Sequence, residues 1–167
     1  MLDLLEKQTW ENLSHWRVCH FGYWFIYGKN TVNSKEKLNE IPSEIYDLMN
    51  HSTLKDSLNI PERYFDQITI NEYLPGSGIA SHCDSHAPFE EPLVSISLLS
   101  DIVMTFYNPE NKETFGVVLP RKSALLLTGK ARYLYEHQIN EWRVDWTDNG
   151  LLYRKLRISL TFRRLKI

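Results

Sequence analysis

From Asp66 onward the sequence is a succession of short segments that are rich in β-branched and aromatic residues and separated by Gly, Pro and Asn. Such segments are typical of β-strands, because these side chains pack well on a pleated surface. Many short strands joined by turns predict a β-sandwich or jelly roll. The predicted strands are DQITINEYL, LVSISLL, DIVMTFYN, FGVVLP, SALLLTG and KLRISLTFRRL.

The N-terminal half of the chain predicts two helices and one strand. The helices lie near Asp3–Leu13 and Ser43–His51, where a proline just before the second suits a helix start. An aromatic strand is predicted at Cys19–Tyr27. If the helices pack on one sheet, the fold is mainly β with flanking helices, an α+β class. Residues Gln138–Leu152 predict a long loop, because they carry two tryptophans and an Asp-Asn-Gly turn.

Length and charge narrow the classes of protein further. With 167 residues, of which 43% are hydrophobic and 24% charged, the chain suits a single globular domain over residues 1–167. It contains no apolar run of membrane-spanning length, and its acidic start does not resemble a secretory signal, so a cytoplasmic or nuclear protein is expected. The net charge of -2 argues against tight, indiscriminate binding to duplex DNA.

The pattern His82-Cys83-Asp84 is the first candidate for metal chemistry. In an extended segment, residues two apart point to one face, so both side chains could reach a single ion. His137 is the best candidate for a third ligand. Two imidazoles and a carboxylate form the facial triad of non-haem iron(II) oxygenases, although the same donors also make an open catalytic zinc site. A packed core histidine is the plainer interpretation of either histidine alone.

The last predicted strand has an unusual polar face. Strand alternation in RKLRISLTFRR aligns Arg157, Ser159, Thr161 and Arg163. Two arginines facing the interior of a small β-fold would be costly unless each meets an anion, and a guanidinium offers a carboxylate two parallel hydrogen bonds. The alternative is an edge strand whose arginines reach water.

A second predicted strand, in ITINEYLPG, aligns Thr69, Asn71 and Tyr73 on one face. Taken in order, N-E-Y-L-P-G, then H-x-D, a distant His, and R-x-x-x-x-x-R on the last strand resemble the AlkB family of iron(II)/2-oxoglutarate dioxygenases. The resemblance covers nearly the whole chain, from about Arg17 to the C-terminus. Within the family, the chain looks closest to the eukaryotic homologue that hydroxylates modified wobble uridines in tRNA. The stretches that carry this similarity are RVCHFGYWFIY, HCDSHAPFEEPLVSISLLSDIVM and LPRKSALLLTGKARYLYEH.

The resemblance implies a double-stranded β-helix fold with iron(II), 2-oxoglutarate and dioxygen as cofactor and cosubstrates. It implies that His82, Asp84 and His137 ligate the iron. By the same resemblance, Asn71 and Tyr73 would bind 2-oxoglutarate and Arg157 would pair with its distal carboxylate. Arg163 would lie beside the cosubstrate near the substrate entrance.

The resemblance also implies a nucleic-acid substrate, with tRNA or another RNA as the expected partner. The reaction would be hydroxylation of a wobble uridine or removal of an N-alkyl group from a base. His86, in the D-S-H after the metal motif, favours the wobble-uridine type. The chain lacks the RNA-recognition and methyltransferase domains of the eukaryotic homologue, so a separate partner could supply tRNA targeting.

The substrate remains open at the level of sequence. Tyr23, Phe25 and Tyr27 share one face of the aromatic strand, in the region that in AlkB relatives helps form a lid over a base taken out of its stack. Ordinary core aromatics are the alternative interpretation. His86 is either a substrate contact, a residue behind the metal site or a turn residue. The acidic pI leaves a protein side chain or small molecule as an alternative substrate, and an inactive binding module is a further alternative.

Overall fold

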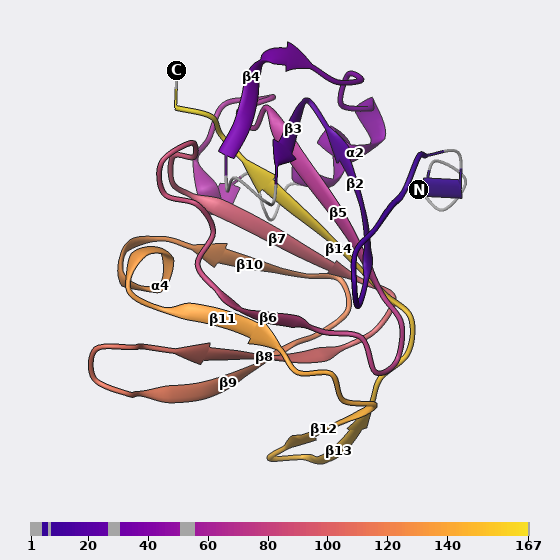
Figure 1. Ribbon diagram of the computed structural model, residues 1–167, viewed down its shortest axis with the longest axis vertical. Helices are drawn as coiled ribbons and strands as arrows, with labels where there is room; N and C mark the ends of the chain where they lie inside the picture. The colour runs from indigo at the N-terminus through magenta and orange to yellow at the C-terminus, as the bar shows by residue number, and fades with distance from the viewer. Residues whose placement is uncertain (1–4, 7, 27–30, 51–55, 167) are drawn as a thin grey trace.

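The computed structural model describes residues 5–6, 8–26, 31–50 and 56–166, and its fold is two facing antiparallel sheets (Figure 1). The larger sheet has the order β1 (Glu11–Asn12), β2 (Arg17–Phe21), β5 (Gln67–Tyr73), β14 (Arg157–Arg163), β7 (Leu93–Leu98) and β10 (Ser123–Leu127). The smaller sheet has the order β6 (Ile79–His82), β11 (Glu136–Ile139), β8 (Ile102–Tyr107) and β9 (Thr114–Leu119). This arrangement confirms the predicted jelly roll.

Strand β14 crosses the middle of the larger sheet and separates two environments. It pairs with β5 in a register that sets Arg157 opposite Tyr73 and Ser159 opposite Asn71. Ile158, Leu160 and Phe162 alternate with these residues and enter a core with Ile45 and Met49 of helix α2 (Ser43–Met49). The helix therefore covers the outer face of the larger sheet. The polar side chains of β14 point into the space between the two sheets.

Two of the N-terminal predictions need correction. The aromatic strand predicted at Cys19–Tyr27 is divided into β2 and β3 (Tyr23–Ile26) by Gly22. Gly22 has a φ of +79°, and a Cβ there would lie 1.8 Å from the carbonyl oxygen of Asp66, so only glycine fits this bend. Strand β3 pairs with β4 (Thr31–Lys37), a strand that the sequence did not suggest.

The helix predicted near Asp3–Leu13 is wrong over its second half. Glu11 and Asn12 form β1, which pairs with Arg17 and Val18 of β2. The second predicted helix is confirmed as α2, which begins after Pro42. Five residues of these predicted elements lie outside the described residues: Asp3, Leu4, Lys7, Tyr27 and His51.

The long loop predicted at Gln138–Leu152 is also wrong. After β11 the chain forms the hairpin of β12 (Val144–Thr147) and β13 (Gly150–Tyr153). The Asp-Asn-Gly sequence that predicted a loop forms the turn of this hairpin, and Gly150 has a φ of +105° there. The short helix α4 (Gly129–Tyr133) precedes β11. In the part of the chain that the structure describes, no helix is long and apolar enough to cross a membrane.

Candidate metal centre

A cavity of about 630 Å³ lies between the two sheets. Its lining combines polar side chains of β5 and β14 with apolar side chains of the opposite strands. All of the candidate site residues predicted from the sequence line this cavity: Asn71, Tyr73, His82, Asp84, His137, Arg157 and Arg163. The alternation predicted for the two polar strands therefore places their side chains in one cavity.

Three side chains with metal-binding atoms meet on one wall of the cavity. His82 ends β6 and lies directly opposite His137 in the register with β11, whereas Asp84 follows in the loop after β6. One ligand atom from each of the three residues lies within 4.8 Å of the others. The distance from His137 Nε2 to Asp84 Oδ2 is 3.6 Å. The pairing of two strands thus brings together donors that are far apart in the sequence.

Hydrogen bonds orient two of these side chains. His82 Nδ1 lies 2.7 Å from the carbonyl oxygen of Ala80, which can only accept, so Nδ1 carries the proton and Nε2 keeps its lone pair. Asp84 Oδ1 accepts hydrogen bonds from Arg163 Nε at 3.0 Å and Nη2 at 2.5 Å. Asp84 Oδ2, on the side of His137, is not bound by that guanidinium and remains for an ion.

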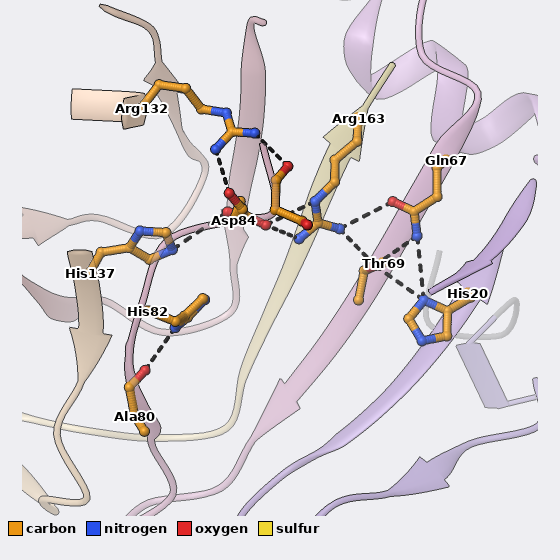
Figure 2. Close-up of polar contacts among 10 residues, drawn as sticks. His20, Gln67, Thr69, Ala80, His82, Asp84, Arg132, His137 and Arg163 are labelled. Carbon is orange, nitrogen blue, oxygen red and sulfur yellow. Dashed lines mark hydrogen bonds and ion pairs between the residues drawn. The ribbon is translucent and has the colours of Figure 1, made fainter. Parts of the chain in front are cut away.

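Arg163 is itself held by β5. Its Nη1 donates to Gln67 Oε1 at 3.1 Å and to Thr69 Oγ1 at 2.8 Å, and His20 lies within 3.1 Å of the same hydroxyl (Figure 2). Burial alone would raise the pKa of Asp84, but the charge of Arg163, with smaller contributions from the nearby histidines, lowers it below its usual range. The Asp84 carboxylate is therefore ionised at neutral pH and can bind a cation.

Arg157 lies in the same cavity and is almost fully buried. Its Nη2 donates to Ser97 Oγ at 2.8 Å, and its guanidinium carbon lies 5.5 Å from the centre of the Tyr73 ring. Its Nε and Nη1 have no hydrogen-bond acceptor among the described residues. Burial lowers the pKa of Arg157 to about 10, which leaves it charged at neutral pH. A buried cation with two free donors is a site for an anion.

The comparisons agree with this geometry. The family model described as the 2OG-Fe(II) oxygenase superfamily matches residues 8–163. The chain belongs to this superfamily. It is 36% identical to mouse tRNA (carboxymethyluridine(34)-5-O)-methyltransferase ALKBH8, over 98% of this chain and 28% of the relative. It is 32% identical to the Arabidopsis thaliana alkylated DNA repair protein ALKBH8 homolog, over 99% of this chain and 54% of the relative.

The chain thus spans only 28% to 54% of the length of these two relatives. Among solved structures, OsALKBH1 superposes with a TM-score of 0.65 at 17% identity, over 93% of this chain and 83% of that chain. At that identity the likeness concerns the fold alone. The superfamily match and these relatives confirm the AlkB-type resemblance seen in the sequence, and the solved structure confirms the fold.

The superfamily implies iron(II), 2-oxoglutarate and dioxygen, and the residues present fit the metal and the dicarboxylate. Burial lowers the pKa of His137 to about 4, so its imidazole is neutral, as a metal ligand must be. The donor set of two imidazoles and one carboxylate is that of non-haem iron(II) oxygenases. The unused donors of Arg157 suit a carboxylate. An open zinc site with the same three ligands would not account for the unused donors of Arg157.

One residue near the metal centre was missed in the sequence. Arg132, on α4, is 2% exposed, and its Nη1 and Nη2 donate to the carbonyl oxygens of Asp84 and Ser85 at 2.6 and 2.8 Å. It therefore fixes the backbone that carries the metal-binding carboxylate, as Figure 2 shows. Nothing in the sequence distinguishes Arg132 from a solvated arginine, because its role depends on where α4 lies.

Of the residues predicted to contact the substrate, some line the cavity and others do not. Phe25 lines the cavity and packs against Phe89 with ring centres 5.9 Å apart, whereas Trp24 is exposed. His86 lies in an exposed turn, where its ring meets Tyr133 edge-on, and it does not line the cavity. The position of His86 therefore fits the interpretation as a turn residue.

Proposed function

We propose that this chain is an iron(II)/2-oxoglutarate-dependent dioxygenase that oxidises a base in RNA. The reaction would be hydroxylation of a tRNA wobble uridine or removal of an N-alkyl group from a base. Two findings support this proposal: the membership of the superfamily, and the similarity over the whole chain to a relative named for a modification of tRNA uridine 34. Tyr23 and Phe25 lie in the strand proposed to cover the base, and Phe25 lines the cavity.

One observation carries the assignment of the site. The same cavity presents a His-Asp-His cluster and a buried arginine with two unused donors. We assign His82, Asp84 and His137 as ligands of iron(II). We assign Arg157 to the distal carboxylate of 2-oxoglutarate, with Asn71 and Tyr73 as further contacts. Arg163 positions Asp84 and borders the cosubstrate.

Iron(II) held by these residues, with 2-oxoglutarate and dioxygen, would supply oxidation of a C–H bond of the substrate, with succinate and carbon dioxide as the other products. The protein orients the reacting groups and shields them from side reactions. Arg163 holds one oxygen of Asp84, which leaves the other oxygen on the side of His137, where the residues would hold the metal. Ala80 fixes the tautomer of His82 through its carbonyl group. Arg157 offers a fork whose geometry matches a carboxylate.

Part of the cavity lining is apolar. Buried Leu93, Met104, Leu127 and Ile139 form this part of the lining. Because the side chains of Arg157 and Asp84 are largely buried, solvent screens their charges weakly, which strengthens their hold on cosubstrate and metal. A planar base stacked near Phe25 would present its substituent to the metal side of the cavity.

The organisation of the protein around this site is part of the proposal. We infer that residues 1–167 form a single AlkB-like dioxygenase domain. We also propose a methyltransferase or RNA-binding partner for this domain, since the mouse relative is named as a tRNA methyltransferase. We place the protein in the cytoplasm or nucleus, where its RNA substrates occur.

The test is a turnover assay with the purified chain. It is incubated with iron(II), 2-oxoglutarate and either modified tRNA or N-methylated RNA oligonucleotides, and succinate and modified nucleosides are measured by mass spectrometry. We expect succinate production that rises with one RNA substrate and a nucleoside that gains oxygen or loses its alkyl group. His137→Ala should abolish both, and Arg164→Lys, which lies outside the cavity, should preserve both.

Other outcomes would replace the proposal. Turnover stimulated by a peptide or small molecule, with no RNA product, would move the same chemistry to that substrate. No succinate above background with any substrate, despite bound iron, would indicate an inactive binding module.

A further inference from the structure

The β12–β13 hairpin carries an apolar face that no described residue covers. On its outer side Trp146 pairs with Leu151 across the strands and Val144 pairs with Tyr153. Trp146 is 76% exposed and Tyr153 is 67% exposed, and Leu151 is also exposed. Figure 1 shows the hairpin projecting below the smaller sheet. Exposed aromatic residues gathered on one small sheet are typical of a binding surface.

The inner side of the hairpin is anchored by a buried ion pair. Asp145 is 1% exposed and accepts two hydrogen bonds from Arg154, from Nε at 2.6 Å and Nη2 at 2.5 Å. Arg154 Nη1 also donates to the carbonyl oxygen of Asn140 at 2.5 Å, and Asp145 accepts from the backbone N–H of Val103 at 3.2 Å. A two-stranded hairpin is marginally stable alone. These contacts hold it, and its aromatic face, in one position.

The start of this hairpin lies near one exposed part of the cavity lining. The exposed part of the cavity lining includes His15, Ser81 and Glu141, and His15 pairs with Glu141 at 3.4 Å. Strand β12 starts three residues after Glu141, which is at most about 10 Å of extended chain. A single strand that places one unit in the cavity and leaves it past Glu141 can therefore continue onto the hairpin.

The surroundings of the hairpin carry unpaired positive charge. Arg143 and Lys155 flank its two strands, and Arg121 and Lys122 lie in the turn between β9 and β10. Hydrogen bonds join these segments, because Ser100 accepts from the Lys155 N–H and Asp101 accepts from the Arg121 N–H. All four cations are exposed, and within the described part of the chain none forms an ion pair.

We propose that the outer face of the β12–β13 hairpin binds the single-stranded RNA whose target base enters the cavity. This inference rests on the proposed function. Aromatic faces for base stacking together with cations for phosphates are the recurrent elements of single-strand recognition. Trp146 and Tyr153 supply the stacking faces, and Arg121, Lys122, Arg143 and Lys155 supply the charges. The net charge of the chain is -2, so this local set, and not the whole surface, attracts the RNA.

The experiment measures binding of a fluorescent single-stranded RNA to the purified chain by anisotropy at several salt concentrations. The test variants are W146A/Y153A and K122E/K155E. The matched controls are L126A, an exposed apolar residue on β10, and K112E, an exposed cation in the turn between β8 and β9. A thermal shift on addition of Mn(II) verifies that each variant retains a folded metal centre.

We expect W146A/Y153A to bind the RNA roughly ten- to a hundred-fold more weakly, as the loss of base stacking predicts. K122E/K155E should also bind more weakly and show a shallower dependence of log affinity on log salt, because fewer phosphates are neutralised. Both controls should bind like the parent chain. Unchanged RNA affinity in W146A/Y153A would overturn the proposal.

Two further measurements separate this inference from the proposed function. If the parent chain binds RNA through the hairpin but oxidises no RNA base, the surface stands and the proposed substrate does not. If the parent chain oxidises RNA and the hairpin variants oxidise it with unchanged KM, the surface assignment fails alone. Self-association that W146A abolishes, with RNA affinity unchanged, would assign the face to a second copy instead and overturn the proposal.

Discussion

Arg157 is the residue whose chemistry can be tested most directly. We predict that Arg157→Lys raises the KM for 2-oxoglutarate roughly 30-fold, because the substitution keeps the charge but loses about 2 kcal/mol of paired hydrogen bonding. Affinity for Mn(II) should change little, since Arg157 contacts neither His82 nor Asp84 in the structure. Steady-state succinate formation and metal titration of the same samples measure the two effects.

The matched control for this prediction is Arg164→Lys. Arg164 neighbours Arg163 but pairs with Asp66 at 3.3 Å and does not line the cavity. It should leave the KM for 2-oxoglutarate unchanged. Equal losses of metal and cosubstrate affinity in Arg157→Lys would contradict the assignment of Arg157 to the dicarboxylate.

His20 predicts a dependence of stability on pH. Burial, together with the charge of Arg163, lowers the pKa of His20 to about 4, against an ordinary value of 6.5. Above pH 6.5 both folded and unfolded chains hold His20 neutral. Between pH 6.5 and 4 the unfolded chain gains a proton that the folded chain does not, so the free energy of unfolding falls, by up to about 3 kcal/mol.

We therefore expect the loss of stability on acidification to be smaller in His20→Asn than in the parent chain. Urea unfolding without metal, at several pH values from 7.5 to 4, compares the slopes, and the contribution of buried His137 is common to both proteins. Parallel slopes would show that His20 does not resist protonation in the folded chain.

At the level of single residues, period-two alternation predicted much of the site. It placed Arg157 and Arg163 on one face of a strand, and Asn71 and Tyr73 on one face of another, and all four line the cavity. It could not give the partner of Arg163, because the contact with Asp84 joins a strand to a distant loop. The roles assigned to these residues remain predictions until cosubstrate and metal binding are measured.

Helix α4 acts on the metal centre through Arg132. We predict that Arg132→Ala weakens Mn(II) binding about tenfold, since loss of groups that orient metal ligands has effects of this size. Arg132→Lys should recover part of the affinity, because one ammonium can reach one of the two carbonyl groups. Calorimetric titration of the apoprotein measures both. Lys130→Ala, an exposed change on the same helix, is the control.

An unaltered Mn(II) affinity in Arg132→Ala would mean that the loop of Asp84 and Ser85 keeps its shape without the guanidinium. Weak metal binding that Arg132→Lys leaves equally weak would instead assign the effect to general loss of packing around α4. Partial recovery therefore distinguishes positioning of the loop from simple destabilisation.

The β12–β13 hairpin should depend on its buried ion pair. We predict that Asp145→Asn lowers the free energy of unfolding by about 3 kcal/mol, because the buried charge of Arg154 loses its counterion. Glu72→Gln removes the partner of Arg17, whose side chain is 42% exposed, and should cost about 1 kcal/mol or less. Urea unfolding followed by circular dichroism compares the two. Similar small losses would mean that the hairpin detaches without affecting the rest of the fold.

The elements that sequence reasoning missed share a physical cause. In the hairpin, Asp145 faces inward and Trp146 faces water, which reverses the usual pattern of a half-buried strand. In the aromatic segment, the break at Gly22 arises from the close carbonyl group of Asp66, a residue far along the chain. Tertiary contacts set both features, so local patterns predicted the central strands of the jelly roll and not its additions.

For the whole molecule, the candidate metal centre joins parts that the chain separates. His82 and His137 belong to neighbouring strands of the smaller sheet, and Asp84 accepts a hydrogen bond from Arg163 of the larger sheet. An ion bound by all three side chains therefore links the two sheets, and unfolding of either one must release it. Metal binding should then stabilise the whole fold and not only the loop after β6.

We predict that Mn(II) at about 100 times its Kd stabilises the folded chain by about 2.7 kcal/mol, which corresponds to a rise in Tm of roughly 5–10 °C for a chain of this size. Addition of 2-oxoglutarate without oxygen should raise Tm further only when metal is present, because the cosubstrate would bind both the ion and Arg157. Differential scanning calorimetry measures these shifts. His137→Ala should abolish the metal-dependent shift, and His86→Ala, which removes an exposed histidine outside the cavity, should retain it in full. Loss of the shift in both variants would place the ion elsewhere on the chain, and its persistence in His137→Ala would remove that residue from the ligand set.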